Sequence, residues 1–242
     1  MKVLLFLCML CFTGHIVLAQ DVRPATDAEK LFVGKVEQRI SQLMANTAAS
    51  MSGNWKIKFD PNKAEQQSIN IAEHAGKAHE YRCFFSMEYI ATPTETKAMN
   101  IELAKYFESM AKKENAAEGK LHDPSLKYSI EVSAVINPYD FSPIDVQKAA
   151  AMGGTVDLPA SVLTFFRSKE LGTSAPSYSV YLGDYTLVNT NGKQMLEENH
   201  ATTTICTDVR TMRIDIRSNP GVAELFLHKL DLAACNRIIQ EL

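Results

Sequence analysis

Two stretches of strict alternation constrain the fold of this chain more than any other feature. Between His79 and Ile90, apolar residues occupy every second position, and between residues 126 and 136 the pattern recurs. Successive side chains of a strand point to opposite faces, so each stretch has one apolar and one polar side. Such strands are typical of an antiparallel sheet with one face on a core and the other in water.

Amphipathic helices are predicted around these strands. A capping box of Thr26 and Glu29 indicates a helix to about Met44, and apolar stripes indicate others over 93–113 and 219–242. Shorter helices are expected after Ser142, and from Asp157 to Gly172 with Phe165 and Phe166 on its apolar side. Residues 177–188 and 201–217 indicate further strands, with a hairpin turn at Asn191-Gly192. We therefore expect an α+β fold: an antiparallel or mixed sheet of about five to seven strands with helices packed mainly on one face.

The first twenty residues indicate export. Lys2 precedes an apolar run that ends near Phe12, and Val17-Leu18-Ala19 resembles a cleavage site. This predicts a signal peptide over 1–20 and a single domain over 21–242, with a possible two-lobe boundary within 137–156. The expected location is the periplasm or the extracellular space, because the run is too short to span a bilayer. A bacterial source is favoured, since no Asn-X-Ser/Thr sequon occurs.

Composition excludes several classes of function. The chain is 46% hydrophobic and 22% charged, which is average for a globular protein with a full core. Its net charge is −3 and it lacks a Lys/Arg cluster, so we expect no nucleic-acid partner. No segment after the leader is apolar over the length that a transmembrane helix needs.

Three cysteines follow the leader. Cys206 falls on a predicted strand and Cys235 on the last helix, so a disulfide between them could fasten that helix to the sheet. The alternative is that Cys83, Cys206 and Cys235 are all buried thiols that pack as small hydrophobic residues. The spacing alone does not decide between these states.

His74, His79 and Cys83 form the best metal candidate in the sequence. His79 and Cys83 share a strand face, and His74 could reach them from the preceding loop. Imidazole and thiolate are ligands that zinc and copper prefer. The alternative is that Cys83 belongs to the core, and no fourth ligand is near in sequence. No cofactor is predicted.

A charged face on a late strand forms the best candidate for ligand binding. Arg213, Asp215 and Arg217 would point away from the core, and two guanidiniums could clamp an anion such as a sugar acid or a phosphate. Tyr181 and Tyr185 could add a stacking surface for a sugar. The alternatives are a solvated sheet face with weak ion pairs, and tyrosines that cover the edge of a core.

Catalytic motifs are missing: the sequence has no Gly-x-Ser-x-Gly, phosphate loop or His-Glu-x-x-His. We therefore expect an exported, non-catalytic binding or accessory protein, whose partner is a small molecule or an envelope protein. One alternative is an exported hydrolase or metal-assisted enzyme that uses His79 and Cys83, or His200 with nearby carboxylates. Another is a structural subunit of an envelope assembly.

Overall fold

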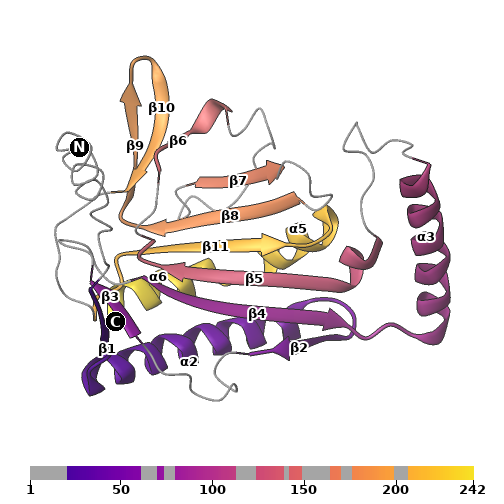
Figure 1. Ribbon diagram of the computed structural model, residues 1–242, viewed down its shortest axis with the longest axis horizontal. Helices are drawn as coiled ribbons and strands as arrows, with labels where there is room; N and C mark the ends of the chain where they lie inside the picture. The colour runs from indigo at the N-terminus through magenta and orange to yellow at the C-terminus, as the bar shows by residue number, and fades with distance from the viewer. Residues whose placement is uncertain are drawn as a thin grey trace, which may run out of the picture.

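The computed structural model describes eight segments of the chain: 21–60, 70–73, 80–112, 124–138, 142–148, 164–169, 176–198 and 207–242. Figure 1 shows strands and helices gathered around one large sheet. The expected α+β fold is confirmed.

A six-stranded antiparallel sheet forms the centre of the structure. Its strands, in spatial order, are β2 (Trp55–Phe59), β4 (Tyr81–Tyr89), β5 (Ser129–Ile136), β11 (Thr211–Arg217), β8 (Pro176–Gly183) and β7 (Thr164–Lys169). The alternation at residues 79–90 predicted β4 correctly, since its burial alternates along the strand. In the second stretch the strand begins later than expected, because residues Pro124–Tyr128 form a 3₁₀ helix, η3.

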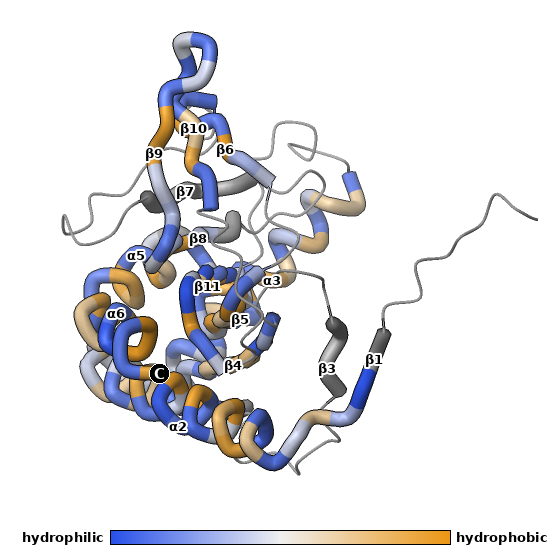
Figure 2. Tube along the Cα trace, turned by 90° about the vertical axis from the view of Figure 1, so that its left-hand side faces the viewer, coloured by the Kyte–Doolittle hydropathy of each residue, from blue (hydrophilic) through white to orange (hydrophobic). Residues whose placement is uncertain are grey.

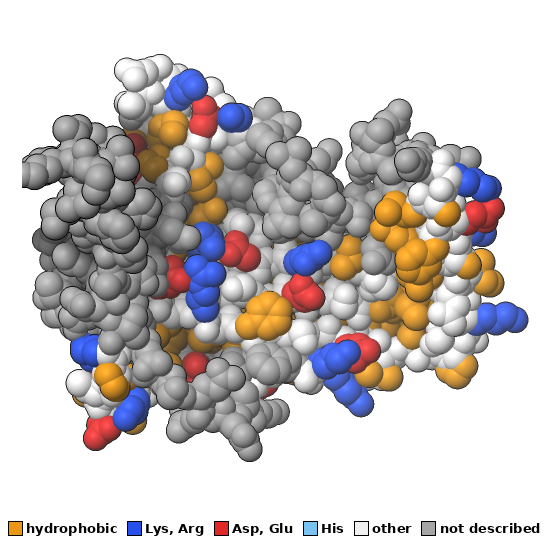
Figure 3. All heavy atoms as spheres, in the orientation of Figure 1, with side chains coloured by type: hydrophobic (Ala, Val, Ile, Leu, Met, Phe, Trp, Pro, Cys, Tyr) orange, Lys and Arg blue, Asp and Glu red, His pale blue; other side chains and the backbone are white. Residues whose placement is uncertain are grey.

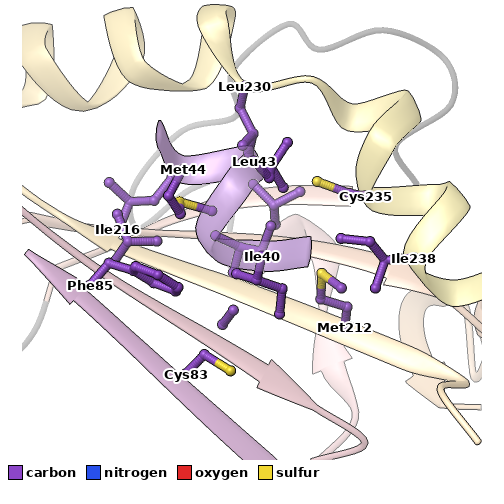
Figure 4. Close-up of a cluster of buried hydrophobic side chains, with 14 of the residues drawn as sticks. Ile40, Leu43, Met44, Cys83, Phe85, Met212, Ile216, Leu230, Cys235 and Ile238 are labelled. Carbon is purple, nitrogen blue, oxygen red and sulfur yellow. The ribbon is translucent and has the colours of Figure 1, made fainter. Parts of the chain in front are cut away.

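Helices cover one face of this sheet. They are α2 (Asp27–Ser50), α5 (Pro220–Lys229) and α6 (Leu232–Glu241), and Figures 1 and 2 show all three on the same side. Their apolar stripes meet the inward side chains of β4, β5, β11 and β8 in one continuous core. Figure 4 shows Ile40 and Met44 of α2 facing Phe85 and Met212 of the sheet across this core. Each fully buried side chain of this size stabilises the fold by roughly 1.5–3 kcal/mol.

A smaller sheet folds over one end of the other face. It has three strands, β6 (Ile144–Asp145), β10 (Lys193–Glu198) and β9 (Tyr185–Thr190), in that order. The predicted Asn191-Gly192 turn joins β9 to β10, and both residues have the positive φ that such turns need. Leu196 packs against Tyr181 and Tyr185 and makes a second, small core. A further two-stranded sheet pairs β1 (Asp21–Pro24) with β3 (Asn70–Glu73).

Helix α3 (Pro93–Ala111) stands at the other end of the sheet, where η3 is its main contact. The predicted helix is confirmed, but none of its residues is buried. Phe107 and Met110 belong to the apolar stripe, yet 60% and 46% of these residues are exposed. Figure 3 shows hydrophobic side chains gathered over this helix.

Three predicted helices differ from the structure. Phe165 and Phe166 lie in β7 and not in a helix, because they pair with β8 at the edge of the large sheet. The last helix is two helices, since Asp231 caps α6 through a bond from the Ala234 N–H and so interrupts the run. Ile144 lies in β6 beside Leu196, so the helix predicted from Pro143 begins later, at Val146, where Asp145 accepts the Lys148 backbone N–H at 2.9 Å. The predicted segments 157–163 and 201–206 lie outside the described residues, as does most of the suggested boundary at 137–156.

The start of α2 has an ion pair that makes stability depend on pH. Glu29 is buried and accepts bonds from Arg23 at 2.7 and 2.8 Å and from the Thr26 backbone N–H at 2.7 Å. The bonds from Arg23 are the main cause that lowers the pKa of Glu29 from 4.5 to about 2. A carboxylate with a depressed folded-state pKa stabilises the protein above its unfolded-state pKa, and this contribution is lost as the pH falls toward 2.

We therefore expect Glu29→Gln to lower the unfolding free energy most at neutral pH. The difference in unfolding free energy between the native protein and the variant should shrink by about 2 kcal/mol between pH 6 and pH 2.5. Urea unfolding at the two pH values measures it. Glu108→Gln, which removes an exposed partner of Lys112, is the control and should show almost no such change. If Glu29→Gln lowers the unfolding free energy by the same amount at both pH values, this explanation is contradicted.

Candidate functional site

The face of the large sheet that the helices leave uncovered is the candidate site, and we call it the open face. Figure 1 shows it between α3 at one end and the β9–β10 hairpin at the other. In the same orientation, Figure 3 shows charged side chains of both signs around exposed hydrophobic ones on it. The side chains that make up the open face come from β4, β5, β8 and β11: Arg82, Phe84, Ser86, Glu131, Ser133, Ser179, Arg213, Asp215 and Arg217.

The predicted arginine–aspartate ladder lies on the open face, as its spacing requires. Met212, Ile214 and Ile216, which alternate with these residues, are fully buried in the core. Asp215 accepts a bond from Arg213 Nε at 2.8 Å and another from the Ser179 hydroxyl at 2.6 Å. Arg217 pairs instead across the strands with Glu131, at 3.7 Å. The ladder therefore contains one tight ion pair and one loose one.

Arg213 has bonding capacity that these contacts leave unused. Its side chain is 24% exposed, and within the described residues its one hydrogen bond is that from Nε to Asp215. Partial burial disfavours its charge, but the adjacent Asp215 outweighs this and the net effect raises the pKa of Arg213. A charged guanidinium held by Nε presents its two terminal nitrogens in the fork that matches a carboxylate or a phosphate.

Tyr181 and Tyr185 lie at the hairpin end of the open face, but both are buried. Their rings meet edge to face, with centroids 5.4 Å apart, and pack under Leu196 of β10. Burial is the main cause that raises the pKa of both hydroxyls. Because the three-stranded sheet covers them, neither ring offers a face on which a sugar could stack. Tyr181 lies directly opposite Arg213 in the strand register and forms part of that residue's surroundings.

The structure describes only one residue of the predicted metal site. Cys83 is buried in the core beneath α2, and burial raises the pKa of its thiol to about 12. A thiol in this environment stays protonated and is a poor metal ligand. His74 and His79 lie outside the described residues, and so does His200. Among the described residues, no group of three or more His, Cys, Asp or Glu is placed to hold a metal ion.

The cysteine of the last helix also lies in the core. Cys235 is a free, fully buried thiol, so the structure does not contain the disulfide with Cys206 that the sequence allowed. Cys206 itself lies outside the described residues. The apolar surroundings of Cys235 in α6 explain its burial without a covalent bond, because free cysteine packs as a small hydrophobic residue.

A pocket of about 580 Å³ lies where α3 meets the end of the open face, and we call it the α3 pocket. Its floor is formed by the ends of β4 and β5, and α3 and η3 supply its walls. The residues that line it include Lys58, Ser86, Glu88, Tyr89, Met99, Tyr128, Ser129 and Glu131. A volume of this size accommodates a small molecule.

Sequence reasoning missed two features of this region. Phe84 occupies a polar position of the alternating strand, between Arg82 and Ser86, and 46% of it is exposed. An aromatic residue on the polar side of such a strand is a signal that could have been used. The α3 pocket had no comparable signal, because it depends on where α3 stands relative to β4 and β5.

No protein-family model, curated protein or solved structure matches this chain. None of the helices in the described segments is long and apolar enough to cross a membrane.

Proposed function

We propose that this chain is an exported, non-catalytic binding or accessory protein whose ligand binds the open face through Arg213. The observation that supports this most is the state of that arginine. Nε is bonded to Asp215, and the terminal nitrogens make no hydrogen bond to another described residue. A guanidinium oriented in this way is prepared to take a planar, two-oxygen acceptor.

The surroundings of Arg213 favour an acidic ligand with hydroxyl groups. Asp215 already accepts bonds from Arg213 and from Ser179, so its carboxylate is occupied while the terminal nitrogens of Arg213 remain to bind an acidic group. Ser133 and Ser179 place small hydroxyl side chains beside the ion pair, and Phe84 adds an exposed ring. A sugar acid combines the carboxylate, hydroxyl groups and apolar ring face that these residues would bind.

Export is supported by the leader-like pattern of residues 1–20, and an exported protein meets envelope polysaccharides and their acidic fragments. An accessory role is supported by the missing catalytic motifs of the sequence.

Binding to Arg213 makes a defined prediction for calorimetry. Glucuronate should bind saturably with a dissociation constant on the order of 1 mM, as expected for one charge-assisted bidentate contact, and glucose should give no saturable heat. Arg213→Gln should weaken glucuronate binding at least tenfold. Higher salt should also weaken binding, since the contact is partly exposed.

The matched control is Arg237→Gln, which removes the same charge from the exposed side of α6, where Arg237 pairs loosely with Asp231. It should leave glucuronate binding unchanged. Equal binding of glucose and glucuronate, or full binding by Arg213→Gln, would contradict the proposal.

A further inference from the structure

We propose that the α3 pocket is a second ligand site, which binds a small uncharged molecule that carries both an aromatic ring and hydroxyl groups. The α3 pocket lies at another end of the sheet and does not involve Arg213. Its aromatic residues, the pairing of its charges and its hydroxyl groups point to such a ligand.

An aromatic wall is held rigidly on one side of the pocket. The ring of Tyr89 contacts the ring of Trp55, with centroids 5.5 Å apart, and the ring of Tyr128, with centroids 5.8 Å apart. It also packs closely on Gly53, where a Cβ atom would lie 2.6 Å from the ring. The Tyr89 hydroxyl donates to Glu95 at 3.0 Å. Aromatic side chains fixed from several sides give a preformed surface for another ring.

The same contacts attach α3 to the rest of the pocket. Glu95 belongs to the capping box that begins α3, where it accepts the Thr92 backbone N–H at 2.7 Å. Further along the helix, Glu102 pairs with Lys127 of η3 at 2.7 Å. These contacts hold the Met99 side of α3 across from the sheet, although none of the residues of the helix is buried.

The charges around the pocket are paired with each other. Lys58 pairs with Glu88 at 3.5 Å, and Glu131 pairs with Arg217 at 3.7 Å. A charged ligand would have to compete with these existing partners, although each pair is half exposed and contributes little by itself. The balanced charges of the lining therefore favour an uncharged molecule.

Hydroxyl groups line the floor beside the aromatic wall. Ser86 and Ser129 both lie on the open-face side of their strands, and their hydroxyls make no hydrogen bond to other residues that the structure describes. Met99 contributes an adaptable apolar side chain from α3. A molecule with a ring for Tyr89 and Tyr128 and with hydroxyl groups for the serines would satisfy both kinds of surface.

Phenyl β-D-glucoside is the test molecule, since it is uncharged and has both an aromatic ring and hydroxyl groups. Phenyl β-D-glucuronide is its charged counterpart. Both are titrated by calorimetry into the Arg213→Gln protein, so that the charged molecule cannot bind at the proposed anion site. The glucoside should bind saturably at one site, and the glucuronide at least tenfold more weakly. Trp55, the only tryptophan of the chain, should change its emission on binding because it contacts Tyr89.

Two variants on one helix locate the site. Met99→Glu, added to the Arg213→Gln protein, places an unpaired charge in the pocket and should weaken glucoside binding at least tenfold. Met110→Glu makes the same change at an exposed position near the end of α3 and should have no effect. Absence of saturable glucoside binding, equal binding of the two molecules, or equal effects of the two variants would overturn the inference. None of these results depends on whether Arg213 binds an anion.

Discussion

Gly183→Ala is expected to destabilise the protein by more than about 4 kcal/mol or to prevent folding. Gly183 has a φ of +93°, which side chains rarely adopt, and a Cβ atom there would lie 2.1 Å from the carbonyl oxygen of Arg210. The obstacle is backbone and not a flexible side chain, so it cannot move aside without disturbing the strand pairing. The close approach of the two backbone segments stabilises the fold, because the Asp184 N–H donates a hydrogen bond to the same Arg210 carbonyl at 3.0 Å.

Variants at two other glycines distinguish the effect of the positive φ from that of the close backbone contact. Gly192 also has a positive φ, +76°, but nothing lies within 4 Å of its Cβ position, so Gly192→Ala should cost only about 1 kcal/mol. Gly34 lies in α2 with open space around it, and Gly34→Ala should stabilise the protein by up to about 1 kcal/mol. Urea unfolding followed by circular dichroism measures all three. If Gly183→Ala lowers the unfolding free energy no more than Gly192→Ala does, the Arg210 carbonyl does not lie as close to residue 183 as described.

Asn137→Ala is expected to cost about 3 kcal/mol, because Asn137 holds the segment that leads into β11. Its side-chain oxygen accepts from the backbone N–H groups of Arg210 at 2.9 Å and Thr211 at 3.3 Å, and its amide donates to the Asp208 carbonyl at 2.8 Å. Asn137 is only 5% exposed, so water cannot replace these bonds easily. Its φ of +49° is one that asparagine tolerates better than alanine.

The variant Asn137→Gly distinguishes the effect of the lost hydrogen bonds on stability from the effect of backbone strain. Glycine accepts the positive φ but has no side chain, so most of the loss, about 2–3 kcal/mol, should persist. Asn189→Ala, at an exposed position of β9, is the control and should change stability by less than about 0.5 kcal/mol. If Asn137→Gly is as stable as the native protein, the hydrogen bonds do not hold this segment. Gly183 and Asn137 also matter for ligand binding, because both contact the segment that leads into β11, and β11 carries Arg213.

The sequence predicted the elements whose pattern is local. The alternation from Tyr81 to Met87, the capping box at Thr26 and the turn at Asn191-Gly192 each depend on neighbours within a few residues, and each is confirmed. Predictions failed where distant partners decide. Ile144 and Asp145 pair with β10, so the helix predicted at Pro143 begins only at Val146, and Phe165 lies in a strand because β8 provides the pairing partner.

The candidate site shows the same division. Periodicity was sufficient to place Arg213, Asp215 and Arg217 on one face, because the residues between them had to fill a core. It could not show that Arg217 would pair with Glu131 and that Arg213 would be held by Nε, since those contacts depend on register between strands. Nor could it show that a second sheet would cover Tyr181 and Tyr185.

The most direct test of the proposed function is the side-chain spectrum of the arginines by nitrogen-15 NMR, recorded while glucuronate is added. The Nε–H signal of Arg213, assigned by its loss in Arg213→Gln, should shift progressively and saturate, and glucose should not move it. The signal of Arg237, at an exposed position on α6, should stay in place with both sugars. An Arg213 signal that does not respond to glucuronate, or that moves equally with glucose, would contradict the assignment of Arg213 as the anchor of the open face.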